Sequence, residues 1–211
     1  MKPIRLCIVR HGETDWNAEK RIQGQIDIPL NAAGRAQAAA TAAGLAGQRF
    51  DAIYSSDLAR TLQTAEPIAA AFGLPLFATP VLRERHYGRM QGLTGAEACS
   101  RFPELHAIYA ARDPHHDLDG GESLADFAER VARALRELAA AHEGQTLLLV
   151  AHGGVLDIAY RLATGRDLVT PRDFPIPNAG LNWLEYRGAG WLLVAWGDKA
   201  HLQKALDEVS G

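Results

Sequence analysis

The sequence predicts an α/β protein with three layers, an α/β/α sandwich in which a mostly parallel β-sheet lies between two layers of helices. Three short apolar segments, at residues 4–9, 50–56 and 145–151, have the length and composition of strands that are buried on both faces. Longer segments with helical periodicity separate them along the chain. Strands that alternate with helices form mainly parallel sheets, because each helix carries the chain back to the edge where the previous strand began.

Two segments in the first third of the chain carry helix boundary signals. Residues 31–48 are rich in alanine, and Asn31 can cap the first turn of a helix there. Residues 57–73 form a second predicted helix, which ends at Gly73. Residues 74–84 then supply one or two short strands before the chain becomes irregular.

The second half of the chain predicts an inserted cap, two helices and a hairpin. Residues 86–120 contain glycine, proline and short helical pieces, and we expect them to form a small irregular or helical cap. Residues 121–144 form the clearest amphipathic helix, and residues 155–165 form another helix after the last buried strand. Residues 179–196 predict an antiparallel hairpin, since Arg187-Gly188 is a turn signal between two apolar segments. The apolar face of the long helix consists of Leu124, Phe127, Val131, Leu135 and Leu138.

The size and composition of the chain exclude several classes of protein. Its 211 residues suit one domain, and we expect a single domain over residues 1–211 with the cap insertion at about 86–120. The net charge of -3, without a basic stripe, argues against nucleic acid as a partner. Cys7 and Cys99 give no disulfide framework. No apolar run reaches the length of a signal peptide or a membrane span, so we expect a cytoplasmic protein without a membrane partner.

Polar residues follow four of the predicted strands. In a sheet of this type, ligands bind beyond the carboxyl ends of the strands. We therefore expect four polar groups, from distant parts of the sequence, to meet at one edge of the sheet. The residues at these positions are Arg10 with His11, Arg60, Glu84, and His152 with Gly153.

These side chains suit a tetrahedral phosphate dianion. The guanidinium groups of Arg10 and Arg60 each offer a planar fork of donors. Helix starts directly behind His11 and His152 would add backbone donors. The arginines lower the pKa of both imidazoles by like-charge repulsion, and a neutral imidazole beside a phosphate is a nucleophile. Metal binding by the two histidines is the alternative, and we favour phosphoryl chemistry because a metal site would recruit carboxylates instead of cations.

Four motifs together resemble a known family. The segments VRHGETDWN, SSDLARTLQTA, LRERHYGRMQG and VAHGG occur in this order. In that order they resemble the histidine phosphatase superfamily, also called the phosphoglycerate-mutase-like family. The resemblance extends over about residues 4–187 and implies the three-layer fold that the strand pattern also predicts.

The resemblance implies a role for each residue at the strand ends. His11 would be the nucleophile that becomes phosphohistidine, and Glu84 would give a proton to the leaving oxygen. Arg10, Arg60 and His152 would form the catalytic phosphate pocket, with no metal and no other cofactor. Further substrate-binding candidates are Asn17, Gln23, Gly24, Arg85, Tyr87 and Gly153.

The sequence favours a phosphatase over a mutase. Mutases of this family have a lysine shortly after the glutamate motif and an arginine pair in the cap, whereas this chain has Gly95 and the separated Arg101 and Arg112. We therefore expect a metal-independent phosphomonoesterase that acts on a small phosphorylated metabolite. A cofactor-dependent phosphoglycerate mutase is the runner-up, and a non-catalytic phosphate-binding module is less favoured because it would not need Glu84. The sequence leaves the physiological substrate open, and a homodimer is an untested expectation.

The segment RDPHHDLDGGES contains two groups of candidate functional residues, and each group has two possible interpretations. His115, His116 and the nearby aspartates could bind a divalent ion, but adjacent ligands on one loop rarely complete a site, so we favour a solvated loop. By the resemblance, Glu122 and Ser123 would lie at the mouth of the phosphate pocket. Alternatively, Ser123 caps the long helix.

Overall fold

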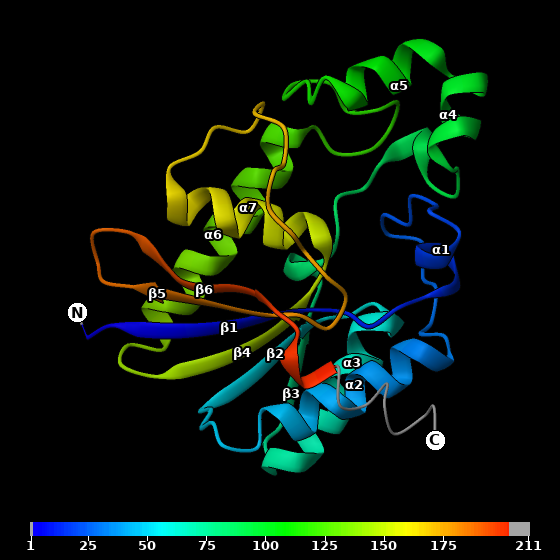
Figure 1. The fold of residues 1–211 in the computed structure, drawn as a ribbon. Coiled ribbons are helices and arrows are strands. Elements are labelled where there is room, and N and C mark those ends of the chain that lie inside the picture. The colour runs from blue at the N-terminus through cyan, green and yellow to red at the C-terminus, as the bar shows by residue number, and fades with distance from the viewer. Residues whose placement is uncertain (1, 203–211) are drawn as a thin grey trace.

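The computed structural model describes residues 2–202, and a six-stranded sheet lies at its centre (Figure 1). The strands stand in the order β3-β2-β4-β1-β5-β6. Their bounds are β1 Ile4–Arg10, β2 Ala52–Ser56, β3 Leu76–Thr79, β4 Thr146–Ala151, β5 Leu181–Tyr186 and β6 Trp191–Asp198. The first four strands pair in parallel, and β5 and β6 form an antiparallel hairpin against β1. The predicted mostly parallel sheet and its hairpin are both confirmed.

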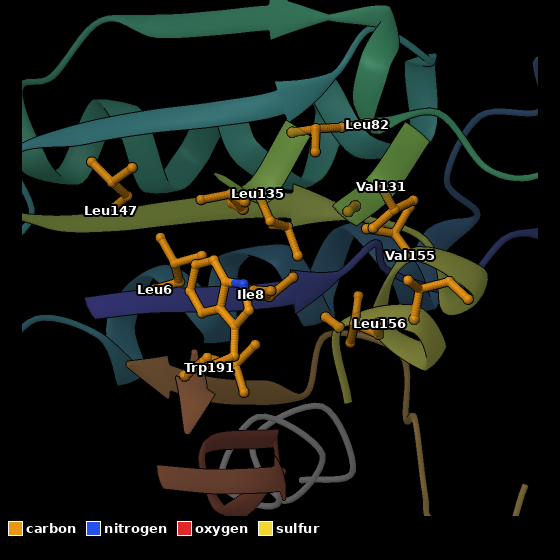
Figure 2. Packing of buried hydrophobic residues seen from close by; sticks show 14 of the residues in the cluster. Leu6, Ile8, Leu82, Val131, Leu135, Leu147, Val155, Leu156 and Trp191 are labelled. Carbon is orange, nitrogen blue, oxygen red and sulfur yellow. The ribbon is translucent and has the colours of Figure 1, made fainter. Parts of the chain in front are cut away.

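Helices cover both faces of the sheet, as the α/β/α prediction requires. Helices α2 (Ala32–Gly44) and α3 (Ala59–Phe72) lie on one face, and α6 (Leu124–Ala141) and α7 (Gly153–Thr164) lie on the other (Figure 1). Each face has its own buried apolar cluster. Figure 2 shows the cluster beneath α6 and α7. Its labelled members are Leu6, Ile8, Leu82, Val131, Leu135, Leu147, Val155, Leu156 and Trp191.

The first strand shows why its sequence is apolar without interruption. Leu6 and Ile8 belong to the cluster under α6 and α7, whereas Cys7 and Val9 belong to the cluster under α2 and α3. Successive side chains of a strand point to opposite faces, so a strand covered on both sides needs apolar residues at every position. All four side chains are fully buried.

Two predicted helix boundaries are confirmed by their capping residues, whereas α6 is shorter than the predicted segment 121–144 and α7 begins two residues before the predicted residue 155. Asn31 caps α2 by accepting a hydrogen bond from the Gly34 amide at 2.8 Å, and α3 ends at Gly73 in the left-handed conformation. Helix α2 ends at Gly44, four residues before the predicted end. Helix α3 begins at Ala59, two residues after the predicted start, with Leu58 at the N-cap position, and the Asp57 carboxylate is paired with Arg83. Residues 74–84 hold one strand, β3, and a 3₁₀ turn at Pro80–Leu82.

The predicted cap is helical and packs around apolar residues of its own. It contains a 3₁₀ turn at Gly88–Met90, α4 (Gly95–Arg101) and α5 (Pro103–Ala110). Its buried cluster is separate from the two clusters of the sheet, and consists of Met90, Ala98, Leu105 and Leu118. In Figure 1 the cap lies beyond one end of the sheet, on the same side as the short helix α1 (Asp15–Ala18). Within residues 2–202, no helix is long and apolar enough to cross a membrane.

Candidate active site

A pocket of about 640 Å³ lies between the carboxyl ends of the parallel strands and the cap. Nearly all the residues that the sequence singles out line its wall. These are Arg10, His11, Asn17, Gln23, Gly24, Arg60, Glu84, Arg85, Tyr87 and Gly153. His152 is fully buried behind His11, with 5.4 Å between the centres of the two rings. The edge of the sheet therefore brings together the groups that four separate motifs supply.

Strand register sets the two histidines side by side. In the parallel pair β1–β4, Arg10 is opposite Ala151, so the next residues along the two strands are His11 and His152. The His11 amide donates to the Ala151 carbonyl at 2.9 Å and extends the ladder by one step. The chain then passes close to α2 at Gly12, where a Cβ would lie 2.5 Å from the Gly34 carbonyl oxygen.

The tautomer of His11 follows from its one hydrogen bond. Its Nδ1 lies 2.7 Å from the Gly12 carbonyl oxygen. A carbonyl can only accept, so Nδ1 carries the proton and donates it. In the neutral ring, Nε2 then holds a free lone pair. His11 thus has its basic nitrogen available for chemistry in the pocket.

Both histidines are neutral at physiological pH. Burial lowers the pKa of His11 well below its usual value, and the charges of Arg60 and Arg10 lower it further. The pKa of His152 is lowered in the same way, first by burial and then by Arg60. Desolvation and nearby cations both disfavour the imidazolium. The result is a pair of uncharged imidazoles beside two cations, which an anion can approach without a proton first leaving either ring.

The two arginines are held by backbone carbonyls instead of carboxylates. Arg60 is fully buried in the first turn of α3, and its two Nη groups donate to Ile26 and Gly24. Arg10 donates to the Ile176 carbonyl at 2.7 Å. Burial lowers the pKa of Arg60 to about 10, which still leaves it protonated at pH 7. Carbonyl partners position the guanidiniums without neutralising them, so their charge remains available to a ligand.

Several buried polar atoms around His11 have no hydrogen-bond partner among the described residues. Buried polar groups in proteins normally have one. Most of these atoms are nitrogens, and two of them belong to cations, so the matching partner is an anion with several acceptor oxygens. The atoms are Arg10 Nε, Arg60 Nε, both ring nitrogens of His152 and Gln23 Oε1.

Glu84 reaches the same place from the segment after β3. Its carboxylate accepts from the Arg85 amide at 2.8 Å and from the Gly154 amide at 2.9 Å. A Cβ on Gly154 would lie only 2.1 Å from Glu84 Oε1. Position 154, in the first turn of α7, must therefore be glycine for the carboxylate to fit where it lies. A Cβ on Gly153 would lie 3.6 Å from Arg10 Nε and 3.9 Å from Glu84 Oε2. The carboxyl group and the arginine therefore border one point in the pocket.

The expected helix start is present behind His152 and absent behind His11. Helix α7 begins at Gly153, directly after His152. After His11 the first helix is α1, which has four residues and begins only at Asp15. Its first amides are satisfied internally by a capping box between Thr14 and Asn17. The expectation of anion-binding backbone donors from a helix directly behind His11 is wrong, because residues 12–14 are not helical.

The other candidates from the sequence are tied to the scaffold in different ways. Asn17 Oδ1 lies 3.2 Å from both the Thr14 amide and Asn178 Nδ2, which donate to it. Gly24 has a positive φ of 55° and presents its carbonyl to Arg60. Arg85 donates to the carbonyls of Glu122 and His116, which joins the pocket wall to the cap.

Glu122 and Ser123 do not face the pocket as the resemblance implied. The Glu122 carboxylate forms a two-point ion pair with Arg130 and also accepts from the His86 amide. Ser123 caps α6, and its Oγ accepts from the Asp126 amide at 3.0 Å. The alternative interpretation of Ser123 as a helix cap is the correct one.

Sequence reasoning missed several charged and aromatic residues of the pocket wall. Trp16 lies inside the first motif but carried no signal of a role, and the others lie outside the four motifs, where the sequence marked Arg112 only as an arginine without a partner in the cap. They come from α1 and the residues after it, from the cap, and from α7 and the loop that follows, and no local signal in the sequence tells that these segments meet around one pocket. The missed residues are Trp16, Lys20, Arg21, Tyr109, Arg112, Asp157 and Arg172.

Comparison with known proteins agrees with this geometry. The family model of the histidine phosphatase superfamily (branch 1) matches residues 6–199. The chain belongs to this superfamily. It is 39% identical over 203 residues to phosphoglycerate mutase-like protein 4 of Arabidopsis thaliana, an alignment that covers 94% of this chain and 87% of that protein. Metal-independent phosphoserine phosphatase of the same plant is 38% identical over 200 residues, with 93% and 82% covered.

Solved structures give the same result at the level of the fold. YhfR of Bacillus stearothermophilus superimposes with a TM-score of 0.88 and 30% sequence identity. The superposition covers 94% of this chain and 99% of that one. The fold and the family expected from the four motifs are therefore confirmed.

The histidine-rich loop of this chain is an exposed turn. Ligand atoms of His116, Asp117 and Asp119 lie within 4.8 Å of one another, whereas His115 is outside the group. His116 Nδ1 accepts from the Leu118 amide, and Asp113 accepts from the amides of the two histidines. These hydrogen bonds hold the residues of the loop in its turn conformation.

Proposed function

We propose that this histidine phosphatase is a metal-independent phosphomonoesterase that hydrolyses a small phosphorylated metabolite through a phosphohistidine at His11. One observation carries the proposal. The free Nε2 of a neutral His11 lies among cationic and imidazole donors that have no partner of their own. A phosphate group bound to those donors places its phosphorus beside a nucleophile that needs no deprotonation.

The first step transfers the phosphoryl group to the enzyme. His11 Nε2 forms a bond to phosphorus while the ester P–O bond breaks, and the electron pair of that bond stays on the leaving oxygen. Glu84, in its protonated form, gives this oxygen a proton. Arg10 and Arg60 balance the charge on the phosphoryl oxygens, and His152 donates to them.

The second step returns the enzyme to its starting state. Water attacks phosphorus, the P–N bond breaks, and the electron pair returns to His11 Nε2. Glu84, now a carboxylate, accepts the proton that the water loses. One carboxyl group thus serves as acid and then as base, and each role is worth on the order of 10²- to 10⁴-fold in rate.

No step of this route assigns a role to a metal ion. Two guanidiniums supply the positive charge that phosphoryl transfer requires and that a divalent ion supplies in many other enzymes. The name of the relative called metal-independent phosphoserine phosphatase supports the same proposal. We expect phosphate release to continue unchanged in the presence of a chelator.

A phosphoglycerate mutase is the second candidate, and the name of the relative called phosphoglycerate mutase-like protein 4 favours it. The residues that form the pocket wall favour hydrolysis. Gly95 is exposed at the start of α4, with no atom within 4 Å of a Cβ placed there, and it is not part of the wall. Arg101 is exposed at the end of α4, so Arg112 is the one of the two cap arginines that lines the pocket. A phosphate-binding module would not need Glu84 at the leaving oxygen.

The proposal is tested with p-nitrophenyl phosphate and an alkyl phosphate. His11→Ala should abolish turnover and labelling by acid-labile phosphate while the fold is retained. Glu84→Gln should give a burst of nitrophenolate near one equivalent of enzyme followed by a slow steady rate, because nitrophenolate leaves without a proton but hydrolysis of the phosphohistidine still needs a base. The alkyl phosphate should give no burst, because both steps are then impaired.

Three results would contradict the proposal. Phosphate trapped on another residue would remove His11 as the nucleophile. Equal bursts with the two substrates would remove Glu84 as the acid. Interconversion of 2- and 3-phosphoglycerate that is far faster than phosphate release would establish the mutase instead.

A further inference from the structure

A second group of charges lies in the same pocket, away from His11. Its centre is Asp157 in α7, whose carboxylate is buried with 7% of its side chain exposed. Arg112 of the cap donates to Asp157 Oδ2 at 2.7 Å. Arg172, from the loop after α7, has its Nε 3.9 Å from Asp157 Oδ1. Asp157, Arg112 and Arg172 all line the pocket.

This cluster has more positive charge than its own carboxylate can balance. Arg161 also donates to Asp157, so three guanidiniums share one negative charge. Arg161 is buried, donates to the Asp167 carbonyl and is not part of the pocket wall. The two uncompensated positive charges therefore lie on the side of the cluster that faces the pocket, where Arg112 and Arg172 are.

Arg112 and Arg172 both have N–H groups that form no hydrogen bond with any described residue. Arg112 uses Nε for the Leu168 carbonyl and Nη2 for Asp157, which leaves its Nη1 without an acceptor among the described residues. Arg172 forms no hydrogen bond within the described part of the chain, and 44% of its side chain is exposed. Arginines that share a partly buried site without full neutralisation favour the approach of an anion.

The cluster is close enough to the phosphate site for one small molecule to reach both. Both sites open into the same pocket, whose volume of about 640 Å³ is that of a site for a whole metabolite. The positive charge of Arg172 lowers the pKa of Arg10, although burial of Arg10 has the larger effect. Tyr87 and Tyr109, packed edge to face at 5.8 Å, form part of the wall that the two sites share.

We propose that Arg112 and Arg172, positioned by Asp157, form a second anion subsite that selects substrates with another anionic group, a carboxylate or a second phosphate, beyond the phosphate that is cleaved. The inference rests on the proposed phosphatase function and specifies its substrate class. The cap contributes one arginine and the loop after α7 the other, so the subsite is complete only when both lie over the sheet. In Figure 1 this loop rises from α7 to the level of the cap.

A purely structural role for these arginines makes a different prediction. Arg112 does tie the cap to the loop through Leu168, so its replacement would disturb both. Arg172 has no such hydrogen bond, and it is therefore the better residue to test. If Arg172 had no ligand, its loss would change the handling of charged and uncharged substrates equally.

The experiment compares substrates that differ only at the end remote from the phosphate. The first pair is 3-phosphoglycerate and glycerol 3-phosphate, in which a carboxylate replaces a hydroxymethyl group. The second pair is 1,3-propanediol bisphosphate and 3-hydroxypropyl phosphate. We expect kcat/KM to favour the anionic member of at least one pair by about 10- to 100-fold, the effect of one or two charged hydrogen bonds. The pair that shows the preference identifies the source of the second anion.

Arg172→Gln should bring this ratio close to one, mainly through KM of the anionic substrate. Arg133→Gln, which removes an exposed arginine of α6 outside the pocket, is the matched control and should keep the wild-type ratio. A binding measurement that needs no turnover supports the same conclusion. In the His11→Ala background, Arg172→Gln should weaken calorimetric binding of the preferred anionic substrate about tenfold, and added salt should reduce that difference.

The outcomes separate the subsite from the phosphatase proposal. Equal kcat/KM within both pairs, while p-nitrophenyl phosphate is hydrolysed, would overturn the subsite alone. An unchanged ratio in Arg172→Gln would also overturn it. If no ester is hydrolysed and no phosphohistidine forms, the phosphatase proposal fails, and the calorimetric comparison still decides whether Arg172 binds a second anion.

Discussion

Two local features of the structure determine how His11 and His152 are placed and which nitrogen of His11 is free. Strand register brings them to adjacent positions, and the hydrogen bond of His11 to the Gly12 carbonyl fixes which nitrogen is free. Burial beside Arg10 and Arg60 keeps both rings neutral. The arrangement suits an anion. It also has a free-energy cost in the folded protein without a ligand, because the buried rings cannot take up protons as they do in the unfolded chain.

That cost predicts a pH dependence of stability. The pKa of each histidine is lower in the folded protein than its unfolded value of about 6.5, so below pH 6.5 the unfolded state binds more protons. The free energy of unfolding should therefore fall as the pH drops from 7 to 5, with each histidine contributing up to about 1.4 kcal/mol per pH unit. Denaturation by urea at several pH values measures this slope in phosphate-free buffer.

His152→Gln is the variant that isolates the effect. It removes one titrating group, so its slope between pH 6.5 and 5 should be smaller than that of the wild type by up to about 1.4 kcal/mol per pH unit, whatever its stability at pH 8. A slope identical to that of the wild type would mean that His152 takes up its proton in the folded state.

At the scale of elements, the site depends on a close contact between the start of α7 and the segment after β3. The Gly154 amide donates to Glu84, and no room remains for a side chain at that position. Arg130 of α6 supports the same segment, because it donates to the carbonyls of Val81 and Arg83 while it pairs with Glu122. Helix packing thus sets the position of the carboxyl group that our proposal uses as acid and base.

Gly154→Ala should impair catalysis more than stability. The added methyl group would overlap Glu84 Oε1, so the carboxylate must move away from the leaving oxygen. We expect kcat for an alkyl phosphate to fall by about 10²-fold, the lower end of the contribution of an acid or base. Gly95→Ala is the control, because position 95 is an exposed helical glycine with open space around it.

The control should keep full activity and gain about 0.5–1 kcal/mol in stability, since alanine favours the helix. Steady-state kinetics and urea denaturation measure both variants. A Gly154→Ala enzyme with wild-type kcat would show that Glu84 does not need its observed position.

At the scale of the whole molecule, the protein consists of a sheet with two large apolar clusters and a cap with a small one. The pocket lies between them, so the proposed substrate would contact both. A small cluster stabilises its elements less than a large one, and we expect the cap to open without unfolding the sheet. The sequence-based expectation of a homodimer stays a prediction, which light scattering in solution would settle.

Two leucine variants test this division. Leu135→Ala in α6 should lower the free energy of unfolding by about 2–5 kcal/mol, because Leu135 is fully buried in a cluster of the sheet. Leu105→Ala in the cap should instead speed amide hydrogen exchange over residues 95–110 and raise KM, with little change in the exchange of β1 and β4. Faster exchange throughout the sheet in Leu105→Ala would show that the cap and the sheet unfold as one unit.

The sequence by itself determined the features that depend on residues close together in the chain. Uninterrupted apolar runs predicted the buried strands, because both faces of each strand are covered. Asn31 and Gly73 predicted a helix start and a helix end, because capping involves only neighbouring residues. The position of polar motifs after strands predicted which residues meet at one edge of the sheet, since parallel strands end on the same side.

Only the tertiary structure decided how those residues are held and what else joins them. The carbonyls that bind Arg60 and the glycine that makes room for Glu84 come from other segments, so these contacts could not be predicted from the sequence around Arg60 or Glu84. Asp157 and Arg112 are 45 positions apart and meet only because the cap folds over α7. The excess positive charge around Asp157 arises only where side chains from distant segments meet in the folded protein. For this reason the residues of the proposed phosphate site could be predicted from motifs, whereas the second group of arginines required the folded chain.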